Sequence, residues 1–208
     1  MRLIDAIAAS PVVAIIRGVT PAEAVDIAQA IFDGGLRAVE VPLNSPSPLE
    51  SIHLIAEAFA GRMAVGAGTV LSAEDVDAVS NVGGTIIVSP NTNAAVIRRA
   101  VELGLDPAPG FSTPTEAFTA IEAGARYLKL FPAVSFGPAH VKQIKAVLPP
   151  KVEVWAVGGV GPGSMAEWWA AGARGFGLGS EVYKAGQTPE VTRRKAKAAF
   201  DAASALAR

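Results

Sequence analysis

The feature that most constrains this chain is a regular alternation of short apolar segments with longer amphipathic ones. Eight short β-rich runs recur along 208 residues, and several are apolar on both sides of the period-2 pattern. Strands of a parallel sheet have this character because helices bury both of its faces. The expected strands are Val12–Ile16, Ala38–Pro42, Ala64–Thr69, Thr85–Ser89, Asp106–Gly110, Tyr127–Phe131, Val152–Gly158 and Gly175–Gly179.

Helix signals lie between these runs. Thr20, Ser72 and Thr113 are N-cap residues with an acid in the following turn. Glycines such as Gly34-Gly35 and Gly83-Gly84 stand where helices should end. The expected helices are Pro21–Asp33, Leu49–Ala60, Ala73–Val82, Ala94–Leu103, Pro114–Ala123, Ala139–Leu148, Ser164–Ala171 and Glu190–Leu206.

Eight strands, each followed by a helix, predict an α/β fold: one (β/α)8 TIM barrel over residues 1–208. Met1–Ser10 is expected to form a short helix before the first strand, at the bottom of the barrel. A doubly wound open sheet is the alternative, although such sheets rarely carry eight regular units.

Composition excludes several classes of function. The net charge of −1 lacks the basic surface that nucleic-acid binding requires. The chain has no cysteine and two histidines, His53 and His140, so thiolate and histidine-rich metal sites are excluded. No apolar run is long enough for a membrane span, and the first residues do not resemble a signal peptide. We therefore expect a cytoplasmic protein with no nucleic-acid or membrane partner.

Two ionisable residues interrupt the predicted strands. Lys129 lies in Tyr127–Phe131, between apolar neighbours, and Glu40 lies in Ala38–Pro42. Burial lowers the pKa of an ammonium group, and a neutral amine can attack a ketone. Glu40 could then move protons. The alternatives are a lysine that reaches the surface and a structural Lys–Glu ion pair.

Other polar and glycine residues stand at the carboxyl ends of strands, where barrels place their active sites. Gly158-Gly159 and Gly179-Ser180 follow the last two strands, where barrels often bind phosphate. Arg17 and Thr69 end the first and third strands and could bind a carboxylate. The glycines could instead serve tight turns, and Arg17 could pair with Glu40.

Several segments resemble the class I aldolases that act on 2-keto-3-deoxy-6-phosphosugar acids, the KDPG/KHG aldolases. They span nearly the whole chain in consistent order. These segments are VAIIRG (13–18), VEVPL (39–43), GAGTV (66–70), VSPN (88–91), PGFSTPT (109–115), LKLFP (128–132) and AVGGV (156–160).

The resemblance implies a role for each matching residue. Lys129 would form a Schiff base with the C2 ketone of the substrate, and Glu40 would be the general acid/base. Thr69, Pro90 and Phe131 would line the site of the pyruvate-derived half, and Arg17 would bind an anionic or hydroxyl part of the substrate. The phosphate would lie at Gly158, Gly159, Gly179 and Ser180. The family is typically trimeric and uses neither metal nor cofactor, so a homotrimer is expected.

The sequence departs from the gluconate-type enzymes at two segments. Asn44-Ser45-Pro46 stands where they usually have Arg-Thr-Pro, and Ala156-Val157-Gly158-Gly159 stands for their Pro-Thr-Gly-Gly. Val157 cannot donate the hydrogen bond that a threonine could, which would alter discrimination at the C4 hydroxyl. The chain therefore looks like the phosphogalactonate branch of the family.

Three other functions stay open. The first is a gluconate-type or 4-hydroxy-2-oxoglutarate aldolase on the same scaffold. The second is a non-catalytic sugar-phosphate binding protein. The third is a phosphosugar isomerase that uses Glu40 alone, which leaves Lys129 unexplained.

Overall fold

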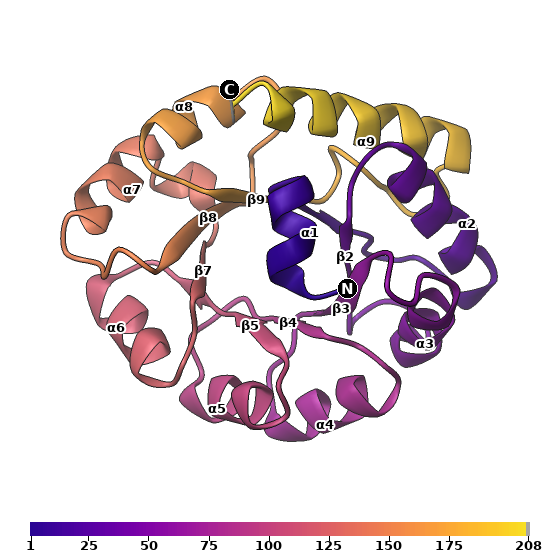
Figure 1. The fold of residues 1–208 in the computed structure, drawn as a ribbon, viewed down its shortest axis with the longest axis horizontal. Coiled ribbons are helices and arrows are strands. Elements are labelled where there is room, and N and C mark those ends of the chain that lie inside the picture. The colour runs from indigo at the N-terminus through magenta and orange to yellow at the C-terminus, as the bar shows by residue number, and fades with distance from the viewer. Residues whose placement is uncertain (207–208) are drawn as a thin grey trace.

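Residues 1–206 of the computed structural model form a closed ring of parallel strands inside a ring of helices (Figure 1). The order of the strands around the sheet is β5-β4-β3-β2-β1-β9-β8-β7-β6, and every pair is parallel. The strands are β1 (Val12–Ile15), β2 (Ala38–Pro42), β3 (Ala64–Gly68), β4 (Ile86–Val88), β5 (Asp106–Ala108), β6 (Gly110–Phe111), β7 (Tyr127–Leu130), β8 (Glu153–Val157) and β9 (Gly175–Leu178).

Strands β5 and β6 are two pieces of one barrel strand, separated by Pro109. The sequence predicted one continuous strand, Asp106–Gly110. Proline has no N–H to donate to a neighbouring strand, so the ladder is interrupted there. The carbonyl of Pro109 still accepts a hydrogen bond from the N–H of Lys129, at 2.9 Å. β5 pairs with β4 and β6 with β7, which closes the predicted (β/α)8 barrel.

The helices follow the strands as predicted. Thr20 and Glu23 form a capping box at the start of α2, and the same arrangement begins α4 and α6. No helix within residues 1–206 is long and apolar enough to cross a membrane. The helices are α1 (Leu3–Ala9), α2 (Pro21–Asp33), α3 (Pro48–Ala58), α4 (Ala73–Asn81), α5 (Ala94–Glu102), α6 (Pro114–Glu122), the 3₁₀ turn η1 (Ala133–Ser135), α7 (Pro138–Lys145), α8 (Met165–Ala170) and α9 (Pro189–Ser204).

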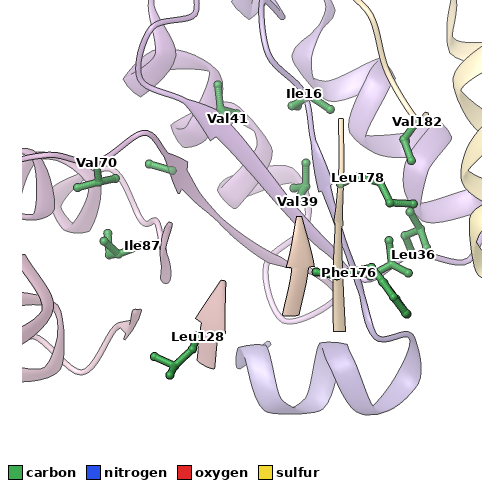
Figure 2. Close-up of a cluster of buried hydrophobic side chains, with 14 of the residues drawn as sticks. Ile16, Leu36, Val39, Val41, Val70, Ile87, Leu128, Phe176, Leu178 and Val182 are labelled. Carbon is green, nitrogen blue, oxygen red and sulfur yellow. The ribbon is translucent and has the colours of Figure 1, made fainter. Parts of the chain in front are cut away.

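Alternation along each strand divides the core in two. Outward side chains such as Val39, Val41 and Leu178 pack against the helices, and Figure 2 shows part of this larger cluster. Inward side chains form a smaller cluster inside the barrel, which includes Leu3 and Ile7 of α1. Helix α1 lies across the middle of the ring in Figure 1 and closes that end of the barrel, as predicted.

Candidate active site

Strands β2 and β7 carry Glu40 and Lys129 into the barrel interior. Val39 and Val41 face the helices, so the side chain of Glu40, between them, faces inward. Glu40 is 3% exposed and Lys129 is 7% exposed. Both line a void of about 10 Å³. The void's other lining residues are Val13, Ile15, Val88, Ala108, Trp155, Val157 and Gly177.

The two groups do not form the ion pair that was one alternative for them. Among residues 1–206, neither Glu40 nor Lys129 has an opposite charge within 4.0 Å. Oε2 of Glu40 is buried and has no hydrogen-bond partner in this part of the chain. Nζ of Lys129 lies 4.6 Å from the centroid of the Phe131 ring. Both groups are therefore buried without a direct ion-pair partner among the described residues.

Burial controls the protonation of both residues. Desolvation raises the pKa of Glu40 from 4.5 to about 7, although Lys129 and Arg17 act in the opposite direction. Desolvation also lowers the pKa of Lys129; Glu40 opposes this change and Arg17 adds to it. A carboxyl that titrates near neutral pH can exchange protons in both directions, and a less basic lysine provides more free amine.

Gly68 provides the space that the Glu40 carboxylate occupies. It ends β3 and pairs with Pro42 of β2. A Cβ at this position would overlap Oε2 and the carboxyl carbon of Glu40, and would lie 2.8 Å from Oε1. Only glycine therefore fits beside the carboxylate in this position.

A larger cavity opens above the void. Its volume is about 520 Å³, within the range of small-molecule sites. Ile15, Val157 and Gly177 line both the cavity and the void, so the two spaces are contiguous. Phe131 also lines the cavity and contacts the Lys129 amine. A ligand in the cavity would therefore lie next to the lysine.

The loops after β8 and β9 form much of the lining of the cavity. Gly158, Gly159, Gly179 and Ser180 all line it, so the structure brings the four predicted phosphate residues together. Gly158 and Gly159 have φ values of 93° and 75°. Gly159 and Ser180 lie outside helices and strands, and among the described residues their backbone N–H groups donate no hydrogen bond to another backbone group. Such free amides can bind an anion.

Arg17 lines the same cavity and is held by two other loops. Its guanidinium donates to Oδ1 of Asn44 and, at 3.5 Å, to Oγ1 of Thr69. Thr69 has a φ of 58°, which is uncommon for a residue with a branched side chain. The alternative pairing of Arg17 with Glu40 is not present among the described residues. Pro90, beyond β4, does not line either space.

Four features of this site were not predicted from the sequence. Asn44 fixes Arg17, and Gly68 makes room for Glu40. Glu181 lines the cavity directly after Ser180, and Lys195 of α9 donates to the carbonyl of Ser180 at 2.9 Å. The position of Glu181 beside Ser180 was visible in the sequence. The contact of Lys195 was not, because α9 reaches this loop only in the folded barrel.

The fold and the site together define the class of protein: an aldolase built on a parallel barrel. The sequence profile described as KDPG and KHG aldolase matches residues 3–196. The chain therefore belongs to the KDPG and KHG aldolase family, whose members are carbon–carbon lyases.

Individual relatives refine this placement. The 2-dehydro-3-deoxy-6-phosphogalactonate aldolase of Escherichia coli K12 is 51% identical over 90% of this chain and 92% of its own length. The KHG/KDPG aldolase of the same organism is 31% identical over 77% of this chain and 75% of its own. A solved structure described as native KDPGal superposes with a TM-score of 0.93, at 49% identity, covering 95% of this chain and 96% of that one.

Proposed function

We propose that this protein cleaves 2-dehydro-3-deoxy-6-phosphogalactonate to pyruvate and glyceraldehyde 3-phosphate through a Schiff base on Lys129. One observation carries the proposal. A buried lysine without an ion-pair partner among the described residues contacts Phe131, which lines a cavity of about 520 Å³ that is also lined by several glycines. Such a lysine is suited to attack a ketone, and such a lining is suited to hold a phosphate.

The proposed reaction begins with attack of the Lys129 amine on the C2 ketone. Loss of water from the carbinolamine gives an iminium that withdraws electrons from C3. Removal of the C4 hydroxyl proton, by Glu40 through a water molecule, breaks the C3–C4 bond, and the electron pair enters the iminium to form an enamine. Glyceraldehyde 3-phosphate departs. Glu40 returns the proton to C3, and hydrolysis releases pyruvate and the free lysine.

The protonation of Glu40 suits this sequence. Its pKa of about 7 allows it to accept one proton and donate another within a single turnover at neutral pH. Because Oε2 has no partner among the described residues, the carboxyl is free to bond a substrate or water. The proposed steps use side chains of this chain and water.

The remaining residues are proposed to bind the two ends of the substrate. Gly158, Gly159, Gly179 and Ser180 would hold the 6-phosphate, and Phe131 would enclose the pyruvate-derived carbons, whereas Pro90 lies outside both spaces. Arg17, aligned by Asn44 and Thr69, would bind an anionic or hydroxyl group of the substrate. Lys195 anchors the Ser180 carbonyl and so supports the loop that would carry the phosphate.

The choice of the galactonate substrate rests on two observations. Identity is 51% to the phosphogalactonate enzyme and 31% to the KHG/KDPG enzyme. Val157, which lines both the cavity and the void, gives this wall an apolar surface where the gluconate-type enzymes have a threonine. The second candidate function is cleavage of the gluconate epimer or of 4-hydroxy-2-oxoglutarate. Comparison of kcat/KM for the two C4 epimers would decide between them.

The central test is trapping with pyruvate and borohydride, read by intact mass and peptide mapping. We expect a pyruvate-derived mass on Lys129 in the wild type and in Lys142→Ala, an exposed lysine of α7, but none in Lys129→Ala. If the protein is a phosphosugar isomerase, no adduct should form in any of these proteins. If it is a non-catalytic binding protein, it should bind a phosphosugar without releasing pyruvate. Folded Lys129→Ala with undiminished cleavage would refute the assignment.

We also propose that the protein is a homotrimer, as the resemblance implies. Several large apolar side chains are exposed in a single copy and would be covered by neighbouring copies; they include Ile4, Leu71, Val134 and Val147. Light scattering coupled to size exclusion would measure the mass of the assembly, and a monomer would contradict the proposal. The cytoplasmic location stays a prediction.

A further inference from the structure

Trp155 lies in the barrel interior beside Lys129. It belongs to β8, and its Cα is the register partner of Lys129 on β7. Both residues face inward, and both line the void that Glu40 also lines. Trp155 is 2% exposed, so the indole fills the space on the side of the void away from the cavity.

Three contacts hold the indole in this position. Gly175 of β9 is the register partner of Trp155, and a Cβ at Gly175 would lie 2.5 Å from Cδ1 and from Nε1 of the ring. The indole N–H donates to Oε2 of Glu153 at 3.3 Å. The ring of Tyr127 lies 5.0 Å away, centroid to centroid. The missing side chain at Gly175 therefore determines where a residue as large as tryptophan can fit.

The indole limits how much water can reach Lys129 from below. The void has about 10 Å³, which is room for at most about one water molecule. Below it, the apolar cluster continues through Tyr127 to Leu3 and Ile7 of α1. A smaller or polar residue at position 155 would open space beside two ionisable groups, and such space fills with water.

Few charged groups act on the protonation of the Lys129 amine besides its desolvation. Glu40 from β2 favours protonation of the Lys129 amine, and Arg17 beyond β1 opposes it. The interior register partners of Lys129 and Trp155 on β6 and β9 are Gly110 and Gly175, which carry no charge. Glu153, two residues before Trp155 on β8, lies further from the cavity, and its carboxylate accepts the hydrogen bond from the indole N–H. Solvent exclusion is therefore the main influence that Trp155 can have on the amine.

We propose that Trp155 is a positioning residue for the reaction: by filling the barrel beneath Lys129, its indole keeps water away from the amine, so that the amine can react at neutral pH. This inference rests on the proposed function, because it concerns the reactivity of the same lysine. Trp155 does not contact the cavity and would not touch the substrate. It acts through Lys129.

The test compares Trp155→Gln with Trp155→Phe. The rate of trapping of pyruvate with cyanoborohydride is measured by intact mass between pH 5.5 and pH 9.5 for each folded protein. In Trp155→Gln, water beside Lys129 should restore much of the ordinary basicity of the amine. We expect the midpoint of its profile to move up by about one pH unit, with about tenfold slower trapping at pH 6 and a rate within about twofold of wild type at pH 9.5. Trp155→Phe should keep the wild-type midpoint.

Two results would overturn the inference. One is an unchanged midpoint in Trp155→Gln. The other is an equal loss at every pH, which indicates a purely structural role. If wild-type protein itself traps no pyruvate, the proposed function fails rather than this inference. If Trp155→Gln does not fold, the emission of Trp155 in Trp168→Phe/Trp169→Phe decides: it must change when pyruvate is trapped at Lys129, and an unchanged spectrum refutes the contact.

Discussion

Replacement of Gly68 by alanine should displace the carboxyl group of Glu40 from its position in the site while leaving the residue itself unchanged. The new Cβ would overlap Oε2 and the carboxyl carbon of Glu40 and would lie 2.8 Å from Oε1, whereas ordinary contacts begin at 3.4 Å. β3 is paired on both sides, with β2 and β4, so the backbone cannot yield easily. The carboxylate must therefore move instead.

The expected loss follows from the size of that movement. Restoring ordinary contacts requires the carboxyl carbon to move by about 1 Å and Oε2 by about 2 Å, and a misplacement of even about 1 Å in catalytic machinery costs about 100-fold in rate. That factor corresponds to about 2.7 kcal/mol in the activation free energy. Because Lys129 keeps its place, we expect the loss in kcat rather than in the affinity for the phosphate end of the substrate.

The assay is release of pyruvate coupled to lactate dehydrogenase, with circular dichroism to verify folding. Gly61→Ala is the matched control. Gly61 precedes β3, has a φ of 72°, and its Cβ would meet nothing within 4 Å. This variant should lose about 1 kcal/mol of stability through backbone strain and keep its kcat. A folded Gly68→Ala enzyme with kcat within about threefold of wild type would refute the argument that Gly68 seats the carboxylate.

Three further predictions follow from the same site. Because burial raises the Glu40 pKa from 4.5 to about 7, the wild type loses stability as pH rises through that window. Glu40→Gln should lack this loss, so above pH 7 its free energy of unfolding, measured with denaturant, should exceed that of the wild type by up to about 3 kcal/mol. A difference between the two proteins that does not change with pH would contradict this prediction. Val157→Thr should raise kcat/KM for the gluconate epimer relative to the galactonate epimer about tenfold, and an unchanged ratio would exclude Val157 from C4 recognition. At Gly159, an alanine Cβ would lie 2.5 Å from Cβ of Val134, so Gly159→Ala should raise KM for the phosphorylated substrate about tenfold while pyruvate trapping at Lys129 persists.

The barrel could be predicted from local signals because each βα unit repeats the same chemistry. The bounds predicted for α2 are those observed, since Thr20, Pro21 and Glu23 mark its start and the glycines after Asp33 mark its end. The strand at 106–111 was less accurate. Its interruption depends on where Pro109 falls in the ladder between β4 and β7, and a single sequence does not contain that register.

The part of the site that could be predicted from the sequence is its pair of ionisable residues within apolar strands. Lys129 and Glu40 stand out because charged groups are rare in apolar strands. Gly68 and Gly175 do not stand out, because a glycine in a strand has several explanations until its neighbour across the sheet is known. The proximity of Trp155 to Lys129 depends likewise on the pairing of β7 with β8. The parts that the sequence could not predict are contacts between strands.

The closure of the barrel by α1 has a kinetic consequence. Leu3, Ala6 and Ile7 occupy the end of the barrel away from the cavity, so substrate and both products must pass through one opening. In the proposed reaction, the phosphorylated aldehyde lies toward that opening while the pyruvate carbons stay attached to Lys129 beneath it. Departure should therefore occur in a fixed order, aldehyde before pyruvate. Steady-state kinetics would then show pyruvate as a competitive inhibitor of cleavage and glyceraldehyde 3-phosphate as a noncompetitive one.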